Sequence, residues 1–346
     1  MARSLSENKK ILVALSGGVD SAMSVYYLQQ AGWEVSAVYF RFLDNRAAEQ
    51  SAEMLARKLK IKLVKKDLRQ KFKKEIIGKF IKSYANNETP NPCVFCNSEF
   101  KFYYLLKVVA RDLKISKVAT GHYAQIKKEK GRAYLLTGLD KIKDQSYFLY
   151  RLKQSQLKNI IFPLGDKKKS EIIEAAKRLG LNPKTKESQN ACFLANEKNI
   201  QNFLLKNLPT QKGEIINEKG IVLGRHLGAF NFTLGQRKGL GISGGPYFVI
   251  GKKGNQLRVA RNKQHIDIFH KKVIFKKVHW INKEPNLGEK YQAKIRYLSK
   301  NQDCRLIKLK KGRWQADFSS PVWAPARGQS LVIYQKNQII GGGIID

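Results

Sequence analysis

A run with two adjacent glycines lies near the beginning of the chain, between a predicted strand at 10–15 and a predicted helix at 21–31. Its six residues are Ser16-Gly17-Gly18-Val19-Asp20-Ser21. Glycine lets the backbone approach an anion closely, and the start of a helix adds unpaired N–H groups and the positive end of its dipole. The order strand, glycine turn and helix therefore predicts a phosphate-binding loop in an α/β fold.

This loop is not of the Walker A type, because no Gly-Lys-Ser/Thr ending follows the glycines. It resembles instead the PP-loop of ATP pyrophosphatases, which release pyrophosphate and activate a carbonyl oxygen as its adenylate. An ordinary glycine turn between a strand and a helix is the alternative interpretation.

Residues 9–120 alternate between apolar stretches and helical patterns, which is typical of a parallel sheet with helices on both faces. The predicted strands are 10–15, 34–40, 61–66 and 116–120, and the predicted helices are 21–31, 46–60, 71–84, 98–113 and 167–180. Ligands of such sheets bind at the carboxyl ends of the strands, where the glycine loop is placed.

After about residue 205, short strands separated by glycine turns replace the helical pattern. The alternating segments Val273–Val278, Tyr291–Tyr297, Arg305–Leu309, Trp314–Phe318 and Ser330–Tyr334 predict a small antiparallel barrel. The run 239–244 matches the dinucleotide fingerprint G-x-G-x-x-G, but it leads into a strand-like segment and opens no helix. We interpret it as a flexible basic turn that contacts RNA phosphates.

The charge of the chain is strongly positive, with 66 Lys and Arg against 27 Asp and Glu and a net charge of +39. Residues 201–346 contain 27 basic and 8 acidic side chains, and Asp267 is the only acid in 221–280. We therefore expect a polyanionic partner, and we expect residues 201–346 to form the main nucleic-acid surface. A lysine-rich proteome is the alternative source of the excess.

No apolar run reaches the length of a membrane span, and the first residues lack the apolar segment of a signal peptide. The four cysteines are too few for a disulfide scaffold in a chain of 346 residues. We therefore expect a cytoplasmic protein without a membrane partner.

Three of the cysteines suggest chemistry. Cys93 and Cys96 follow a segment stiffened by Pro90 and Pro92, and Cys192 lies far away in the chain. We expect the close pair at or beside a helix start, where the dipole favours the thiolate. Cys304 alternates with polar residues in a strand and is interpreted as a small buried residue.

Together these motifs closely resemble the bacterial tRNA-specific 2-thiouridylase family, over essentially the whole chain. The matching segments are Ser16–Ser21, Thr89–Cys96, Ala119–Tyr123, Lys143–Leu149, Phe232–Gly241, Gly328–Ser330 and Gly341–Ile345. The resemblance implies an adenine nucleotide α-hydrolase-like PP-loop domain with a parallel sheet at 1–200, a small mostly-β central domain at 201–268 and a C-terminal antiparallel β-barrel at 269–346.

The same resemblance implies an activity. The enzyme would use ATP and Mg²⁺ to adenylate the C2 oxygen of the wobble uridine of tRNA. Sulfur from a cysteine persulfide would then replace that oxygen and give 2-thiouridine, AMP and pyrophosphate. The implied partners are tRNA and a sulfur donor protein, either a relay protein or a cysteine desulfurase.

Roles carry over onto the matching positions. Cys96 would be the nucleophile, and Cys192 the persulfide carrier that forms a transient disulfide with Cys96. The implied ATP contacts are Ala14, Leu15, Ser16, Gly17, Gly18, Val19, Asp20, Ser21, Phe40 and Gly121. The implied substrate and tRNA contacts are Asn91, Pro92, Cys93, His122, Lys143, Asp144, Gln145, Arg296, Tyr297 and Gln329.

Cys93 departs from the pattern, since many relatives have Asp at this position. Three thiols, Cys93, Cys96 and Cys192, would suit an iron–sulfur cluster with one open iron, as in related cluster-dependent thiolases. We favour the interpretation of Cys93 as a variant of the persulfide site. Zinc is less expected, because structural zinc sites usually have four protein ligands.

Two other functions remain open at this stage. A PP-loop amidotransferase or ligase that uses ammonia would leave Cys96 and Cys192 without a role. A basic RNA-binding or ribosome-assembly factor would use ATP only for regulation. Analysis of thiolated nucleosides separates these possibilities.

Overall fold

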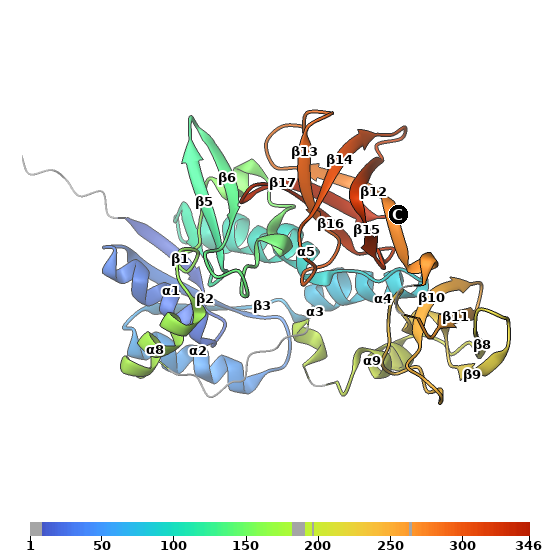
Figure 1. Cartoon of the computed structure of the whole chain (residues 1–346). Helices are drawn as coiled ribbons and strands as arrows, with labels where there is room; N and C mark the ends of the chain where they lie inside the picture. Colours follow the sequence, from blue (N-terminus) through green and yellow to red (C-terminus); the bar gives the residue numbers. More distant parts are fainter. Residues whose placement is uncertain (1–8, 182–190, 196, 263–264) are drawn as a thin grey trace, which may run out of the picture.

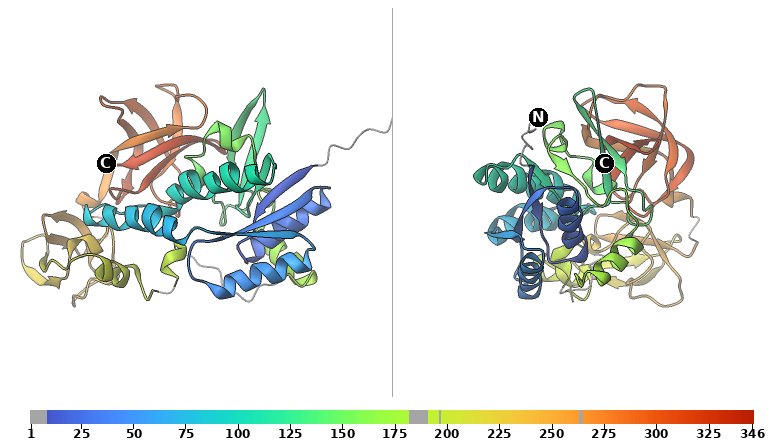
Figure 2. Two further views of the ribbon diagram at one scale, coloured as in Figure 1. Left: turned by 180° about the vertical axis from the view of Figure 1, so that it is seen from behind. Right: turned by 90° about the vertical axis from the view of Figure 1, so that its left-hand side faces the viewer.

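The computed structural model describes residues 9–181, 191–195, 197–262 and 265–346. An α/β unit built on the N-terminal half lies at one end of the molecule, and a barrel and a small β unit lie at the other (Figure 1). The views in Figure 2 show helices that run between these parts.

The α/β unit contains a parallel sheet of order β3-β2-β1-β4-β7. Its strands are β1 Lys10–Ala14, β2 Glu34–Arg41, β3 Lys62–Asp67, β4 Lys117–Ala119 and β7 Ile160–Ile161. The four predicted strands and their parallel arrangement are confirmed. Strand β7 was not predicted, because two residues are too few to show a periodicity.

Helices cover both faces of this sheet, as expected. Ile11 and Val13 of β1 pack in one core with residues of α1 Val19–Gln30, α2 Arg46–Lys58 and α8 Lys169–Arg178. Leu12, which points to the other face, packs in a second core with Phe102, Leu105 and Val109. The alternation of β1 therefore fixes which helices lie on which side.

Two longer helical runs each include π-helical turns. The first comprises α3 Arg69–Phe72, η1 Lys73–Ile77 and α4 Gly78–Ala85, close to the predicted 71–84. The second comprises α5 Pro92–Phe95, η2 Cys96–Lys101, η3 Tyr104–Val109 and α6 Ala110–Asp112. The predicted start of this run at 98 is therefore wrong: Pro92 occupies the first turn, where its fixed φ favours helix and its missing N–H costs nothing.

The C-terminal barrel has six antiparallel strands in the order β12-β15-β14-β13-β16-β17 and is closed by the pairing of β12 with β17. The strands are β12 Phe269–Trp280, β13 Lys290–Lys294, β14 Gln302–Lys308, β15 Trp314–Trp323, β16 Ser330–Gln335 and β17 Gln338–Ile345. The predicted antiparallel barrel is confirmed, and Cys304 is buried in β14, as interpreted.

A hairpin that was not predicted joins the α/β unit to the barrel. Its strands are β5 Ala124–Glu129 and β6 Arg132–Thr137, and Leu136 pairs with Gln338 of β17. Buried residues of the hairpin, of the α/β unit and of strands β16 and β17 form one continuous core. The two units therefore share apolar packing as well as backbone pairing. Figure 1 shows β6 beside β17.

The small β unit has a sheet of order β10-β11-β8-β9, preceded by a helix. Its elements are α9 Ile200–Asn207, β8 Gly213–Ile216, β9 Val222–His226, η6 Ala229–Asn231, β10 Phe248–Lys253 and β11 Gln256–Ala260. The run 239–244 leads into β10 and opens no helix, so its exclusion as a dinucleotide site is confirmed. The remaining short elements are η4 Ser146–Leu149, α7 Gln154–Leu157, η5 Cys192–Leu194 and η7 Ile266–Ile268.

Throughout the part of the chain that the structure describes, each helix is too short or too polar to cross a lipid bilayer.

Candidate active site

The glycine loop lies where β1 ends and α1 begins. Gly17 has φ +84°, and a Cβ at this position would lie 2.4 Å from the carbonyl oxygen of Ala48 in α2. The hydroxyl of Ser51, one turn further along α2, donates to the Gly17 carbonyl at 2.8 Å. Only glycine fits this approach, so α2 holds the loop against the start of α1.

Two serines close the loop from inside. Ser21 Oγ donates to the Gly18 carbonyl at 2.8 Å and accepts from the Ser16 N–H at 3.1 Å. Gly18 is the N-cap of α1 and has no side chain that would occupy the unpaired N–H groups of the first turn. These groups are thus left to an anionic ligand.

Asp20 in this first turn is held by two side chains from distant parts of the chain. Tyr123 Oη donates to Asp20 Oδ1 at 2.7 Å, and Lys169 Nζ lies 2.7 and 2.8 Å from its two carboxylate oxygens. Gly121 is close as well, since a Cβ there would lie 2.9 Å from the Asp20 carbonyl carbon. The sequence analysis did not predict Tyr123 and Lys169 as site residues. Tyr123 is the last residue of the matching segment Ala119–Tyr123, whereas Lys169 belongs to none of the matching segments.

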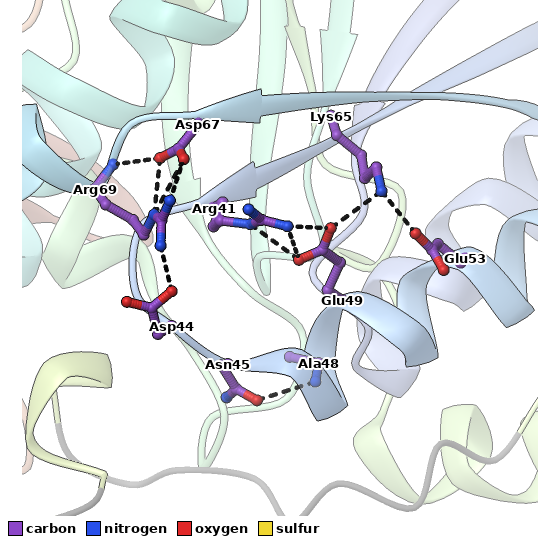
Figure 3. Close-up of polar contacts among 9 residues, drawn as sticks. All are labelled: Arg41, Asp44, Asn45, Ala48, Glu49, Glu53, Lys65, Asp67 and Arg69. Atoms are coloured by element: carbon purple, nitrogen blue, oxygen red, sulfur yellow. Dashed lines mark hydrogen bonds and ion pairs between the residues drawn. The ribbon is translucent and has the colours of Figure 1, made fainter.

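A network of charged side chains connects the ends of β2 and β3 to α2 (Figure 3). Arg41 donates three hydrogen bonds of 2.6, 2.7 and 3.0 Å to Glu49, and Lys65 lies between Glu49 and Glu53 at 3.1 and 2.9 Å. The Arg41 hydrogen bonds, assisted by Lys65, lower the pKa of the Glu49 carboxyl. Glu49 therefore stays ionised and fixes α2 beside the predicted nucleotide residue Phe40.

A second part of this network lies at the start of α3. Arg69 binds Asp67 at 2.7 Å and also contacts Asp44, and the hydrogen bonds from Arg69 lower the pKa of Asp67 to about 2. Asn45 caps α2 by accepting from the Ala48 N–H at 3.0 Å. Asp44 and Asn45, the last two residues before α2, are thus both held by polar contacts.

The cysteine pair lies on the second helical run, with Cys93 in α5 and Cys96 at the start of η2. Phe193, the neighbour of Cys192, packs with its ring centroid 4.9 Å from Phe80 and 5.7 Å from Phe203. Cys96 and Phe40 contact the same hydrophobic cluster as Phe193. The cluster therefore brings the exposed Cys192 into the neighbourhood of Cys96.

The expected thiolates are absent from this arrangement. Burial raises the pKa of Cys96 to about 12, and it also raises the pKa of Cys93. Loss of solvation opposes the charged form more strongly than the helix start favours it, so the prediction of a thiolate is wrong for this state. The Lys101 ammonium is a smaller, opposing influence on both thiols, and sequence reasoning missed it.

Within the described ranges, no group of three or more His, Cys, Asp and Glu side chains is arranged to hold a metal ion. The three thiols Cys93, Cys96 and Cys192 accordingly do not form a preassembled cluster site.

His122 lies near the same place. Its Nδ1 shares a hydrogen bond of 2.7 Å with Thr120 Oγ1, and its ring packs on Phe102 and Phe162. Burial, with Lys101 as a second cause, lowers the pKa of His122 well below its ordinary value. The imidazole is therefore neutral at physiological pH.

The predicted tRNA loop is organised from within. Asp144 is buried and accepts from the N–H groups of Gly138 and Ser146 at 2.9 and 3.1 Å, so its carboxylate shapes the loop. Gln145 exchanges two hydrogen bonds with the backbone of Tyr123, at 2.8 and 3.1 Å. Lys143 is partly exposed on the same loop. The loop thereby contacts the residue that holds Asp20.

Arg296 and Tyr297 lie where the barrel meets the other units. Arg296 Nη2 donates to the carbonyls of Leu234 and Ala324, both at 2.8 Å, and its guanidinium lies over the Trp323 ring. The ring centroids of Tyr297 and Phe148 lie 4.5 Å apart. Arg296 therefore connects the small β unit to the barrel.

The remaining predicted contacts surround the cysteine loop. Asn91 is buried at the N-cap of α5, and Pro92 follows in its first turn. Gln329 Nε2 donates to the Thr89 carbonyl at 2.9 Å. Ala14 ends β1, Leu15 follows it, and Val19 begins α1.

Comparison with known protein families identifies three consecutive domains. The models match as the tRNA methyl transferase HUP domain at residues 9–196, the tRNA methyl transferase PRC-barrel domain at 201–261 and the aminomethyltransferase beta-barrel domain at 270–345.

Three relatives illustrate the similarity, and each carries the name tRNA-specific 2-thiouridylase MnmA. The protein of Buchnera aphidicola subsp. Schizaphis graminum is 37% identical over 99% of this chain and 98% of its own length. That of Syntrophomonas wolfei is 39% identical over 97% of this chain and 99% of its own length. That of Salmonella typhimurium is 36% identical over 98% of this chain and 97% of its own length.

Proposed function

The chain belongs to the tRNA-specific 2-thiouridylase family, and on this premise we propose that it uses ATP to replace the C2 oxygen of the wobble uridine of tRNA with sulfur. The observation that carries the proposal is the placement of Phe40. It lies one residue before the end of β2, the strand next to the glycine loop, and contacts the same hydrophobic cluster as Cys96 and Phe193. A nucleotide on the loop would thus lie beside the thiols.

The first half of the reaction is adenylation. The uridine O2 attacks the α-phosphorus of ATP, pyrophosphate leaves, and AMP remains on O2 as a good leaving group. The loop residues Ala14 to Ser21 would cradle the phosphates through backbone N–H groups, and Phe40 and Gly121 would border the nucleotide. Mg²⁺ bound with ATP would supply charge neutralisation, and the Asp20 carboxylate is a suitable oxygen ligand.

The second half is sulfur transfer. The terminal sulfur of a persulfide on Cys192 attacks C2 and AMP leaves, which produces a Cys192–S–S–C2 adduct. The Cys96 sulfur, after loss of its proton, then attacks Cys192 Sγ. This step forms the Cys96–Cys192 disulfide and leaves the sulfur on C2 as 2-thiouridine. A cellular reductant must reopen the disulfide, and a sulfur donor protein must reload Cys192.

The substrate would reach this site over all three domains, which we assign to 1–200, 201–268 and 269–346. Asn91, Pro92, Cys93, His122, Lys143, Gln145, Tyr297 and Gln329 would line the entry for the target nucleotide. Asp144 and Arg296 would support that surface from within, since their polar atoms bind protein groups. We place the reaction in the cytoplasm, where tRNA and ATP are available.

Reconstitution tests the proposal. The purified protein is incubated with unmodified tRNA, Mg²⁺-ATP, a cysteine desulfurase with cysteine as the source of sulfane sulfur, and a reductant that reopens the disulfide, and the digested nucleosides are separated by mass spectrometry. We expect 2-thiouridine, together with AMP and pyrophosphate in equal amounts. Ammonia incorporation, or tRNA binding without a modified nucleoside, would contradict the proposal.

A further inference from the structure

One edge of the small β unit is open. Strand β9 lies at the end of the sheet order β10-β11-β8-β9, and among the described residues it pairs with β8 alone. An edge strand presents unpaired backbone N–H and C=O groups along one side, and these groups can pair with an extended segment of another chain. The sheet can therefore be extended at β9.

Exposed apolar side chains distinguish this edge from the other sheet edges of the molecule. Ile221 and Val222 at its start are 56% and 50% exposed, and Leu227 just after its end is 46% exposed. No other run of seven described residues contains more than two exposed large hydrophobic side chains. Single apolar residues are normal on a protein surface, whereas a cluster of them along an open strand is typical of a protein-binding site.

The charge of the small β unit favours an acidic partner. Residues 201–261 contain ten Lys and Arg side chains and two Asp and Glu side chains. Arg225 is exposed within β9 itself, between the apolar positions. A second copy of this chain would bring like charges together at this edge, which disfavours self-association. RNA would match the charge but not the apolar side chains, whereas an extended protein segment with acidic and apolar residues matches both.

The small β unit packs directly against the segment that contains Cys192. Phe230, three residues after Leu227, lies in one hydrophobic cluster with Phe193 and Phe203, and the ring centroids of Phe193 and Phe203 are 5.7 Å apart. Helix α9, which contains Phe203, leads from this segment into β8. Cys192 itself is exposed. A protein bound along β9 is thus held by the unit that supports Cys192.

We propose that the open edge of β9 is the docking site of the sulfur donor, a cysteine desulfurase that adds an extended acidic segment to this sheet. The inference rests on the proposed function, because it requires Cys192 to be reloaded with sulfur. In that step the Cys192 sulfur, after loss of its proton, attacks the outer sulfur of a persulfide on the desulfurase. The S–S bond of the donor breaks, the donor cysteine leaves as its thiolate, and Cys192 becomes the persulfide.

The transfer of labelled sulfur tests the docking site. A purified cysteine desulfurase and radiolabelled cysteine are incubated with the full-length protein without reductant, and label on Cys192 is followed by non-reducing electrophoresis and peptide mass spectrometry. Inorganic polysulfide, which is too small to need a docking site, loads the same cysteine in a parallel reaction. The double variant Val222→Ser with Leu227→Ser is compared with Ile307→Ser, the control, which changes an exposed isoleucine of the barrel strand β14.

We expect the double variant to lower the initial rate of transfer from the desulfurase by about tenfold, as for the loss of two apolar contacts from an interface. Loading by polysulfide and the affinity for tRNA should change by less than about twofold, because neither depends on the apolar edge. Ile307→Ser should match the wild type in all three measurements. Circular dichroism checks that each variant is folded.

Arg225→Gln tests the charge of the edge and keeps its apolar side chains, so it also serves if the double variant fails to fold. We expect transfer from the desulfurase to fall about threefold at low salt, and the difference from the wild type to shrink as salt is added. Arg305→Gln, at an exposed arginine of β14, is the control and should transfer sulfur like the wild type. Unchanged transfer in Arg225→Gln would contradict an acidic partner.

Four results with the double variant or the wild type would overturn the inference. They are unchanged transfer in the double variant, an equal loss of loading by polysulfide, a loss of tRNA affinity with transfer intact, and a wild type that polysulfide loads but the desulfurase does not. If polysulfide fails to load wild-type Cys192, or if the loaded protein forms no 2-thiouridine with tRNA and ATP, the proposed function fails. That outcome is distinct from the other four.

Discussion

The side chain of Gln329 donates a hydrogen bond of 2.9 Å to the backbone carbonyl of Thr89, 240 residues earlier in the chain. The Thr89 N–H in turn donates to the Arg327 carbonyl at 2.7 Å, and its hydroxyl lies 3.0 Å from that of Thr233. The barrel and the small β unit therefore both bind Thr89, which begins the segment that leads to Cys93. The position of the cysteine loop depends on the packing of all three units.

Gly328→Ala should disturb this loop. Gly328 has φ +91°, and a Cβ there would lie 2.9 Å from the Thr89 nitrogen and 2.8 Å from Glu88 Cβ. The segment before Cys93 must move, and small displacements of reacting groups cost about a hundredfold in rate. We expect formation of 2-thiouridine to fall at least about tenfold, measured by nucleoside mass spectrometry, with ATP affinity unchanged.

Gly312→Ala is the matched control. Gly312 also has a positive φ, +67°, but among the described residues no atom lies within 4 Å of its Cβ position. Both variants carry the backbone strain of about 1 kcal/mol, and only Gly328→Ala carries the clash. Equal turnover in the two variants would contradict a role for the Thr89 contact.

Tyr123→Phe should slow cleavage of ATP without unfolding the protein. The variant removes the hydroxyl that donates to Asp20 at 2.7 Å. Hydrogen bonds to charged groups contribute about 1.5–3 kcal/mol, so we expect roughly a tenfold loss of AMP formation. Chromatography of radiolabelled nucleotides measures the products, and the exposed Tyr103→Phe serves as the control.

Asp20→Ala should abolish the formation of AMP and pyrophosphate with folding retained, because it removes the carboxylate at the centre of the site. ADP as the main wild-type product would contradict the assignment of a PP-loop.

Alkylation of Cys96 should be slow near neutral pH. Burial raises the pKa of Cys96 to about 12 from an ordinary 9.0. A raised pKa means that the folded protein contains less thiolate at pH 8 than the unfolded chain does, and thiolate is the reactive form. We expect the rate of iodoacetamide modification of Cys96, followed by peptide mass spectrometry, to keep rising through pH 9 to about 11. A plateau below pH 9 would contradict this.

Lys101→Met should slow this reaction further. The Lys101 ammonium lowers the pKa of Cys96 against the larger influence of burial, so its removal leaves still less thiolate at a given pH. The exposed Lys107→Met, on the same helical run, is the control and should react like the wild type. Equal rates in both variants would show that Lys101 does not act on the thiol.

Local patterns in the sequence predicted the helices and strands, but they did not predict the contacts between distant segments. The glycine loop and the strands beside it were predictable, because the spacing of apolar residues and glycines reports on local structure. The ion pair of Lys169 with Asp20 and the strand pairing of Leu136 with Gln338 form only because the chain folds back on itself. The thiolate prediction failed for a related reason: the helix start is local, whereas the burial of Cys96 by Phe193 and its neighbours comes from distant segments.

The salt dependence of tRNA binding should distinguish a phosphate contact from a structural arginine. Lys238 is exposed in the basic turn before β10, whereas Arg296 binds the carbonyls of Leu234 and Ala324. We expect Lys238→Met to reduce the slope of log K against log salt by about 0.9, the value for one phosphate contact. Arg296→Met should weaken binding and lower the melting temperature with the slope unchanged. A slope reduced by about one in Arg296→Met would assign that side chain to the RNA instead.

The cysteines should separate sulfur transfer from the steps before it. Cys96→Ser and Cys192→Ser should each eliminate 2-thiouridine, since in the proposed mechanism Cys192 carries the persulfide and Cys96 releases the sulfur. Both variants should still bind tRNA and use ATP, because adenylation involves neither thiol. Filter binding and the release of pyrophosphate measure these two properties, and Cys304→Ser, in the barrel, is the control with full thiolation expected.

Cys93 decides between the two routes for sulfur. On the persulfide route, Cys93→Asp should retain substantial activity in air, and the protein should contain no iron. Within the described residues the three thiols are not arranged as a metal site. A cluster would instead give stoichiometric iron, labile sulfide and broad absorbance near about 400 nm in anaerobically prepared protein. Each cysteine substitution would then reduce the iron content. Activity that depends on that iron would contradict the persulfide route. Full aerobic activity of the iron-free protein would exclude the cluster.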